Sequence, residues 1–306
     1  MKKVGYLYDD IFLLHEMPSG HPESAERLIA INNALKQSDV NDKPVYIKPR
    51  KADLQDILAV HNSSYIDEVM KFVGYYDPDT YISKNSTEAA LYAAGAVIEA
   101  VDACKRGNIE RAFCAVRPPG HHAEADRAMG FCIFNNIAVG ARYAQKSGFR
   151  KVFIIDFDVH HGNGTQHIFE EDGTVFYFST HQYPHYPGTG GDSELGKGSG
   201  YGYTYNMPMH YGAGDKDFFA AYQDILPGLV NRFDPDIILV SAGYDLHVND
   251  PLAGLRVTDE GIRNIVRGIL SSKKNIPYIF SLEGGYNLTS LSESVLITLE
   301  ELLYFE

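Results

Sequence analysis

The stretch "KVFIIDFDVHHGNGTQ", residues 151–166, begins as an apolar run typical of a buried strand and then turns polar. Its end carries two acids, Asp156 and Asp158, followed by two imidazoles, His160 and His161. Residues two apart on a strand face the same way, so Asp158 and His160 project together. A carboxylate in a dry interior is costly unless a metal ion or hydrogen bonds compensate its charge. The stretch therefore predicts either a metal site or a hydrogen-bonded Asp–His pair at the end of a buried strand.

Three further apolar runs are followed directly by polar side chains. "AFCAVRPPG" leads to His121 and His122, and "DIILVSAG" leads to Asp245. "PYIFSLEGG" leads to Tyr286. The carboxyl ends of parallel strands lie along one edge of a sheet, which is where such sheets bind ligands. We therefore expect these side chains to meet the acids and imidazoles of residues 156–161 in space.

The residue types that converge there suit metal-assisted hydrolysis. Asp245 is a candidate third ligand beside the Asp-x-His pair, and three protein ligands leave one position open for water, as in catalytic zinc sites. A histidine, His121 or His122, is the most frequent general base toward such a water. Tyr286 follows two glycines that allow a tight turn, and its hydroxyl can donate to an oxyanion.

Each of these features also has a purely structural interpretation. The Asp-x-His pair can be a buried hydrogen-bonded pair, the tandem histidines can lie on a surface loop, and Tyr286 can be one packed aromatic among 21 tyrosines. Convergence of four clusters on one edge favours function over these alternatives. In that arrangement Asp156 can orient one of the tandem imidazoles and Asn163 the other.

Short β-branched runs alternate with helix-like stretches, which predicts an α/β fold with a mainly parallel sheet and helices on both faces. No linker or change of composition marks a boundary, so we expect residues 1–306 to form a single domain. Pro22 and Thr258 are helix-start signals, and residues 181–202, rich in Gly, Pro and Tyr, predict a long functional loop. The expected strands are residues 3–8, 44–48, 112–116, 151–157, 174–180, 203–208, 236–242 and 276–282. The expected helices are residues 22–37, 64–73, 87–106, 133–147, 217–232, 258–271 and 288–303.

The composition narrows the classes of partner and compartment. The net charge of −13 disfavours direct nucleic-acid binding, which needs a basic face. The three cysteines form no C-x-x-C pair, which disfavours a disulfide framework and favours the reducing cytoplasm. Asp9 and Asp10 interrupt the N-terminal apolar run too early for a signal peptide or a membrane span, so we expect no membrane partner. The oligomeric state is open.

Several motifs, taken in their order, resemble the histone deacetylase superfamily, which includes acetylpolyamine amidohydrolases and bacterial deacetylase-like proteins. The motifs are "GHPESAERL", "RPPGHHAEADRAMGFCIFNN", "IIDFDVHHGNGTQ", "YPGTGG", "SAGYDLHVNDPLAGLRVT" and "LEGGYNL". The motif "HHGNGTQ" is more similar to class II members than to class I members, which usually have Asp where this chain has Asn163. The resemblance implies an arginase/deacetylase-like three-layer fold with its active site at the carboxyl edge of the sheet. It also implies one catalytic Zn²⁺, or Fe²⁺ in some members.

The resemblance assigns a role to each motif residue. His121 and His122 match the tandem catalytic histidines, with Asp156 behind the first and Asn163 behind the second. Tyr286 matches the tyrosine that stabilises the transition state. The residues that match the metal ligands are Asp158, His160 and Asp245.

The family also has a narrow acyl channel and a structural potassium site. Gly130, Phe131 and Tyr186 match the channel walls, and Arg27 matches a residue near its inner end. Leu252 stands where acetylpolyamine enzymes tend to carry an acidic gatekeeper, which favours acyl-lysine or general amide substrates. The potassium site would use the backbone of Asp156, Asp158, His160 and Thr180 and the hydroxyl of Ser179.

The implied function is zinc-dependent hydrolysis of an acetylated amine, such as acetyl-lysine in a peptide or protein, to acetate and the free amine. The first alternative is an acetylpolyamine amidohydrolase. A second is a non-catalytic acyl-lysine-binding protein, which the complete set of ligands, histidines and tyrosine disfavours. Arginases share the fold but bind two manganese ions through extra carboxylates, and Gly162 stands where a second metal would need an acid.

Overall fold

The computed structural model describes residues 1–306 and contains one central sheet of eight strands. The strand order is β2-β1-β5-β10-β9-β6-β7-β8, and every neighbouring pair is parallel. All carboxyl ends of the strands therefore lie along the same edge. The strands are β1 (Val4–Leu7), β2 (Val45–Ile47), β5 (Arg111–Cys114), β6 (Val152–Asp156), β7 (Val175–Gln182), β8 (Thr204–Met209), β9 (Ile237–Ala242) and β10 (Tyr278–Leu282).

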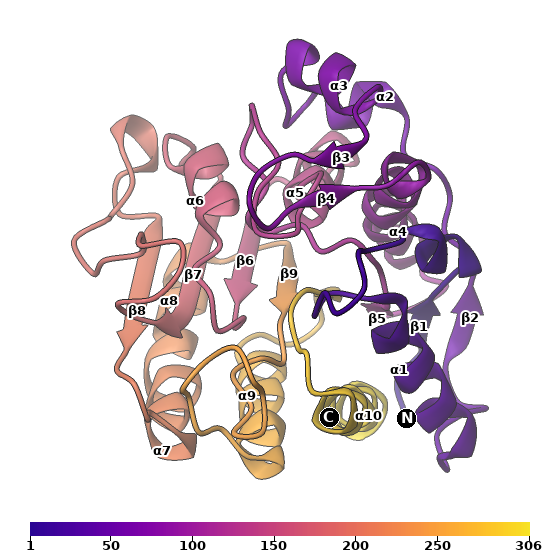
Figure 1. Ribbon diagram of the computed structural model, residues 1–306. Coiled ribbons are helices and arrows are strands. Elements are labelled where there is room, and N and C mark those ends of the chain that lie inside the picture. The colour runs from indigo at the N-terminus through magenta and orange to yellow at the C-terminus, as the bar shows by residue number, and fades with distance from the viewer.

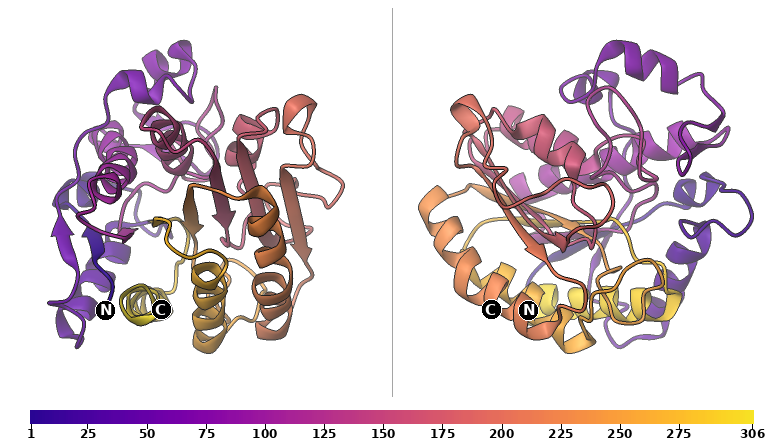
Figure 2. Two further views of the ribbon diagram at one scale, coloured as in Figure 1. Left: turned by 180° about the vertical axis from the view of Figure 1, so that it is seen from behind. Right: turned by 60° about the vertical axis from the view of Figure 1, so that its left-hand side comes forward.

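Helices cover both faces of the sheet, which makes three layers (Figure 1). One face is covered by α4 (Ser86–Lys105), α5 (Asn136–Lys146) and α6 (Asn163–Phe169). The other face is covered by α1 (Ala25–Gln37), α7 (Asp215–Phe219), α8 (Leu226–Phe233), α9 (Asp259–Ser271) and α10 (Leu288–Tyr304). The two further views in Figure 2 show the same separation of the helices by the sheet. The expected α/β fold with a parallel sheet and helices on both faces is confirmed.

The inner strands are buried along their whole length because helices pack on both sides of them. All five residues of β6 are buried, and its Phe153 stacks on Phe176 of β7 with ring centroids 4.7 Å apart. Near-continuous apolar runs are what parallel strands covered on both faces require. One hydrophobic core extends from Val4 to Leu303. None of the helices combines the length and the apolar character that crossing a membrane requires.

All eight expected strands are present, whereas the helices differ from the prediction at their ends. Pro22 does not begin a helix, because α1 starts at Ala25 with Ser24 in the N-cap position. Thr258 does cap α9, and its side chain accepts a hydrogen bond from the backbone N–H of Gly261. The single helix expected at 217–232 is two helices joined by a π-helical turn, Ala220–Ile225.

Two short α-helices, two short strands and two 3-10 helices, Asp10–Leu14 and Gly198–Gly200, have no counterpart among the expected elements. They lie where the sequence has too few residues for a periodic pattern to be recognised. One of the α-helices, α6, begins at Asn163 inside the motif "HHGNGTQ". The other α-helix is α2 (Leu54–Ile57), and the two strands form a small antiparallel hairpin, β3 (Gly74–Tyr75) and β4 (Tyr81–Ile82).

The loop expected at 181–202 begins later, because β7 continues to Gln182, and it folds back over the carboxyl edge of the sheet. Glu194 accepts hydrogen bonds from the backbone N–H groups of Gly190 and Gly191, both at 2.9 Å. Its other carboxylate oxygen accepts from the side-chain amide of Gln166 on α6 at 2.6 Å. These bonds tie the loop to α6, and they hold Tyr186 near the end of the sheet.

Two helical glycines should respond in opposite ways to alanine. A Cβ at Gly95 in α4 would overlap the carbonyl oxygen of Arg50 and lie 2.8 Å from the backbone nitrogen of Ala52. We expect Gly95→Ala to destabilise the protein by about 1–3 kcal/mol, because backbone atoms cannot move aside as a side chain can. Gly228 in α8 has no atom within 4 Å of such a Cβ. Gly228→Ala should therefore stabilise by about 0.5–1 kcal/mol through helix propensity. Thermal unfolding of both variants tests the pair, and a stable Gly95→Ala variant would contradict the packing.

Candidate active site

Three potential metal ligands converge at the carboxyl ends of β6 and β9. The ligand atoms of Asp158, His160 and Asp245 all lie within 4.8 Å of one another. The imidazole Nδ1 of His160 is 3.1 Å from Asp158 Oδ1 and 3.2 Å from Asp245 Oδ2. Asp245 Oδ2 is buried and has no hydrogen-bond partner. Since buried polar atoms are nearly always satisfied, this orphaned oxygen indicates a place for a cation.

Backbone hydrogen bonds hold the two carboxylates in position. Asp158 Oδ2 accepts from the N–H of Gly284 at 2.8 Å, and Asp245 Oδ1 accepts from the N–H of Val159 at 3.0 Å. Gly284 must be glycine here, because a Cβ would overlap the carboxylates of Asp245 and Asp158. Each carboxylate thus keeps one oxygen on the protein and turns the other toward His160, so the ligand set is preorganised.

The local pKa values show a concentration of negative charge. Burial, and then Asp158, raise the pKa of Asp245 to about 7 although His160 opposes the shift. Burial acts to raise the pKa of Asp158 too, but the imidazoles of His121 and His160 outweigh it and lower that pKa. Burial would lower the pKa of His160, yet the two carboxylates raise it to about 10. A divalent cation at this point would compensate the same charge, so the donor set fits a metal ion.

The tandem histidines follow β5 and each contacts a different partner. His121 Nδ1 lies 3.0 Å from Asp156 Oδ2, and His122 Nδ1 lies 2.7 Å from Asn163 Oδ1. Asn163 donates through its Nδ2 to Glu124 at 2.6 Å, which fixes the direction of the amide. His122 therefore carries its proton on Nδ1 and leaves Nε2 free to accept one. The structure brings both rings together, with centroids 4.0 Å apart.

The two adjacent imidazoles have opposite protonation tendencies. Burial alone would lower the pKa of His121, but Asp156 and Asp158 outweigh it and raise the pKa to about 10. Burial lowers the pKa of His122 well below its ordinary value, and the positive charges of His121 and His160 lower it further. One ring is thus a proton donor and the other an acceptor, which is the pairing that general acid–base chemistry needs.

A narrow cavity of about 90 Å³ opens onto these groups. The rings of His121, His122 and His160 line its inner part. All four residues expected at the channel and its mouth also line it, namely Gly130, Phe131, Tyr186 and Leu252. A Cβ at Gly130 would overlap the His122 ring, so only glycine permits this approach of the wall.

Tyr286 lines the same cavity, whereas Arg27 does not. Arg27 is completely buried behind Tyr286, with its guanidinium carbon 5.0 Å from the centre of the tyrosine ring. It donates to the carbonyls of Gly285 at 2.7 Å and Glu283 at 2.5 Å. These bonds make Arg27 a support of the turn that carries Tyr286.

Three acidic residues of the site are not among the site residues predicted from the sequence. Asp79 reaches the cavity from the β3–β4 hairpin, beside Thr80, whose hydroxyl accepts from the N–H of Phe131 at 3.1 Å. Asp250 accepts from the N–H of Tyr286 at 2.7 Å. Glu283 accepts from backbone N–H groups near the tandem histidines. The acidic residue in "LEGGYNL" could be noted, but its partner, more than 160 positions away, could not.

The residues expected to bind potassium lie where β6 ends beside β7, and Asp156 of β6 is the register partner of Ser179 within β7. The Ser179 hydroxyl hydrogen-bonds to His181 Nδ1 at 2.8 Å. The Thr180 hydroxyl pairs with the Tyr222 hydroxyl at 2.8 Å. The two segments are therefore adjacent.

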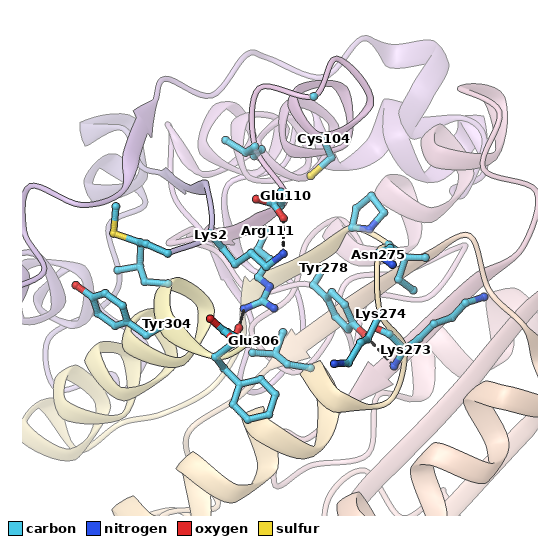
Figure 3. A pocket seen from close by; sticks show the side chains of 18 residues that line it. Lys2, Cys104, Glu110, Arg111, Lys273, Lys274, Asn275, Tyr278, Tyr304 and Glu306 are labelled. Carbon is cyan, nitrogen blue, oxygen red and sulfur yellow. Dashed lines mark hydrogen bonds and ion pairs between the residues drawn. The ribbon is translucent and has the colours of Figure 1, made fainter.

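A larger cavity, of about 780 Å³, lies at the opposite edge of the sheet, where β5 and β10 begin (Figure 3). Four of its six charged side chains form bonds within the protein. Lys2 pairs with Glu110 at 2.7 Å, and Arg111 donates to the carbonyl of Leu302 at 2.8 Å. Lys273 donates to the carbonyl of Pro235 at 2.7 Å. Since no acid–base pair or metal-ligand set converges there, we place the active site at the carboxyl edge.

The chain is similar to known proteins over most of its length. A family model described as "Histone deacetylase domain" matches residues 21–302. The chain is 41% identical to "Histone deacetylase 14, chloroplastic" of Arabidopsis thaliana, over 92% of this chain and 73% of the plant protein. It is 35% identical to "Polyamine deacetylase HDAC10" of Homo sapiens over 95% of this chain, but it spans only 46% of the human protein. A crystal structure of the HDA15 HD domain superposes with a TM-score of 0.92 at 39% identity, over 99% of this chain and 91% of that chain.

Removal of one carboxylate should test the metal centre. We expect Asp245→Ala to lose most of its bound divalent metal, because two protein ligands make a poor site. Loss of an outer partner of a ligand already costs roughly 10–100-fold in metal affinity, and loss of a ligand should cost more. Elemental analysis of the purified variant gives the metal content. Asp236→Ala, at the amino end of the same strand, is the matched control and should keep its metal. Full metal content in Asp245→Ala would exclude Asp245 as a ligand.

Proposed function

The chain belongs to the histone deacetylase family, and on this premise we propose that it is a zinc-dependent deacetylase that converts an acetylated amine into acetate and the free amine. Membership places it among hydrolases that act on acetylated amides. The observation that carries the proposal is one narrow cavity lined by the tandem histidines, Tyr286 and His160, with the other two members of the metal-ligand set, Asp158 and Asp245, beside His160.

Zinc is the metal that the donor set suits best. Two carboxylates and one imidazole are ligands that Zn²⁺ accepts, and three protein ligands leave a position open, as in catalytic sites. Fe²⁺ can use the same kinds of ligand. When bound, the metal would supply Lewis-acid polarisation of the amide carbonyl and make a nearby water more acidic. Asp158, His160 and Asp245 would hold it.

The chain's own side chains supply the proton transfers. His122 is held neutral, with Nδ1–H on Asn163, so its Nε2 can take the proton of the attacking water. His121 is held protonated by Asp156, so it can give a proton to the leaving amine. Burial raises the pKa of Tyr286 well above its ordinary value. Its hydroxyl therefore stays protonated and can donate to the oxyanion of the tetrahedral intermediate.

The channel supports acetyl-lysine as the preferred substrate class. The rings of Phe131 and Tyr186 can enclose an unbranched aliphatic chain, and a cavity of about 90 Å³ admits little more. Leu252 puts an apolar side chain at the mouth, where a carboxylate would attract a second ammonium group. One observation favours the alternative of an acetylpolyamine: the Asp79 carboxylate also lines the cavity, and a polyamine would carry positive charge past it.

A structural potassium ion is a further part of the proposal. The end of β6 pairs with the middle of β7, which brings the backbone of Asp156 next to Ser179 and Thr180. Backbone carbonyls and a hydroxyl are hard oxygen donors suited to such an ion. The backbone of Asp158 and His160 would complete the site. An ion there would stabilise the loop after β6, which carries two of the three metal ligands, Asp158 and His160.

A parallel rate comparison tests the function and its substrate. We expect a higher kcat/KM for a fluorogenic acetyl-lysine peptide than for acetylspermidine. A chelator should abolish hydrolysis of both substrates, and added zinc should restore it. Leu252→Glu should shift the ratio toward acetylspermidine by about 5-fold, since a carboxylate near a second ammonium contributes about 1 kcal/mol. An unchanged ratio would remove Leu252 from the selectivity, and chelator-resistant hydrolysis would contradict the metal mechanism.

Tyr286→Phe tests the role of the tyrosine hydroxyl. Loss of one oxyanion donor typically lowers kcat by about 10²–10³. KM and zinc content should change little, because the ground-state carbonyl is a weaker acceptor and the tyrosine is not a ligand. Tyr244→Phe is the matched control, since that hydroxyl pairs with Thr298 at 2.8 Å inside the core. Near-normal kcat in Tyr286→Phe would remove this side chain from the reaction.

A further inference from the structure

Glu283 is a buried acid that the mechanism above does not use. It directly follows β10, its side chain is completely buried, and no lysine, arginine or histidine forms an ion pair with it. Burial, together with the charges of Asp156 and Asp158, raises its pKa to about 7, while His121 and the N–H of Gly120 oppose the shift. An acid in such a place is costly unless its hydrogen bonds have a purpose.

The carboxylate of Glu283 connects three segments of the site. Oε2 accepts from the backbone N–H groups of Gly120 at 2.6 Å and His121 at 3.2 Å. Oε1 accepts from the hydroxyl of Ser241 on β9 at 3.0 Å. The side chain thus attaches the turn that carries the tandem histidines to the strand that leads to Asp245.

The main chain at the same residue continues to the other reacting groups. The carbonyl of Glu283 accepts from Arg27, and the next N–H, that of Gly284, donates to Asp158 Oδ2 at 2.8 Å. Tyr286 follows two residues later. One residue therefore links the histidine turn through its side chain with the metal-ligand loop and the tyrosine turn through its backbone.

Close packing makes the length of this link matter. A Cβ at Gly120 would lie 2.5 Å from the backbone nitrogen of Asn136, and a Cβ at Gly284 would overlap the metal-ligand carboxylates. Both backbone segments are thus packed tightly against other parts of the site. The Glu283 side chain spans the distance between them, so a shorter side chain at this position would have to draw one of them out of its packing.

We propose that Glu283 is a positioning residue of the deacetylase site, whose carboxylate holds the His121–His122 turn in register with the metal ligands and Tyr286. This inference rests on the proposed function. It assigns Glu283 no contact with substrate and no proton transfer. Its contribution is geometric, and a misplacement of about 1 Å at a reacting group can cost roughly 100-fold in rate.

A series of substitutions at Glu283 separates geometry from charge and from stability. Glu283→Ala leaves two backbone N–H groups without an acceptor, and we expect kcat to fall about 100-fold with KM within about 3-fold of wild type. Glu283→Asp keeps the charge but shortens the link, so its kcat should be lower than that of wild type by about 10-fold or more. Glu283→Gln keeps the full length of the side chain, with an oxygen to accept from the two backbone N–H groups and its NH₂ toward the Ser241 hydroxyl. Its kcat should be within about 5-fold of the wild-type value. Metal content should stay at the wild-type level in all three.

Glu301→Ala is the matched control, because Glu301 is a nearly buried acid on α10 that pairs with Arg263 at 2.5 Å and Arg267 at 2.9 Å. It should lower the melting temperature and leave kcat unchanged. If Glu283→Ala and Glu283→Asp behave like this control, the residue is only structural and the inference fails. A Glu283→Gln variant as slow as Glu283→Ala would assign the effect to charge and also overturn it. If Glu283→Ala does not fold, the comparison of kcat between Glu283→Asp and Glu283→Gln still tests the positioning role. Wild-type protein inactive on both acetylated substrates would instead overturn the proposed function, and the positioning role with it.

Discussion

Negative charge buried where the parallel strands end is the constraint on which the rest of this site depends. Asp156, Asp158, Asp245 and Glu283 are each at most 1% exposed. In a dry interior such acids repel one another and are destabilising unless each has a partner. Imidazoles, backbone N–H groups and hydroxyls supply those partners, but one oxygen of Asp245 has none. The remaining charge calls for a cation, and the placement of every nearby group is consistent with holding one.

The order of the strands turns this constraint into a site. The neighbours β5, β10, β9 and β6 form the middle of the sheet. In that order they carry the tandem histidines, the Glu283–Tyr286 turn, Asp245, and the Asp158–His160 pair. Four segments that are distant in the chain thus end side by side, since parallel strands in register finish at one edge. The side chains that meet at this edge are buried, and the narrow cavity opens onto them.

The same surroundings give two identical side chains different tasks. His121 faces buried carboxylates and is held protonated, whereas His122 is buried, contacts an amide oxygen and lies beside the cationic His121, so it is held neutral. Separated pKa values of this kind assign the acid and the base without any difference in residue type. The sequence "HH" alone does not show which histidine is the acid and which is the base. That depends on the group that the Nδ1 atom of each ring contacts in the folded protein.

The sequence by itself determined the strands, the parallel sheet, and the order in which polar clusters follow buried runs. It also predicted that Asp158 and His160 lie together, and the structure brings them together in the loop that follows β6. Only the tertiary structure decided which residues beyond these clusters take part. It placed Arg27 behind Tyr286 instead of in the cavity, brought Asp79 to the cavity from a hairpin too short to recognise, and joined Glu283 to the turn at Gly120. Such contacts leave no local pattern, because periodicity records how a segment meets its own neighbours, whereas these partners meet only when distant segments pack.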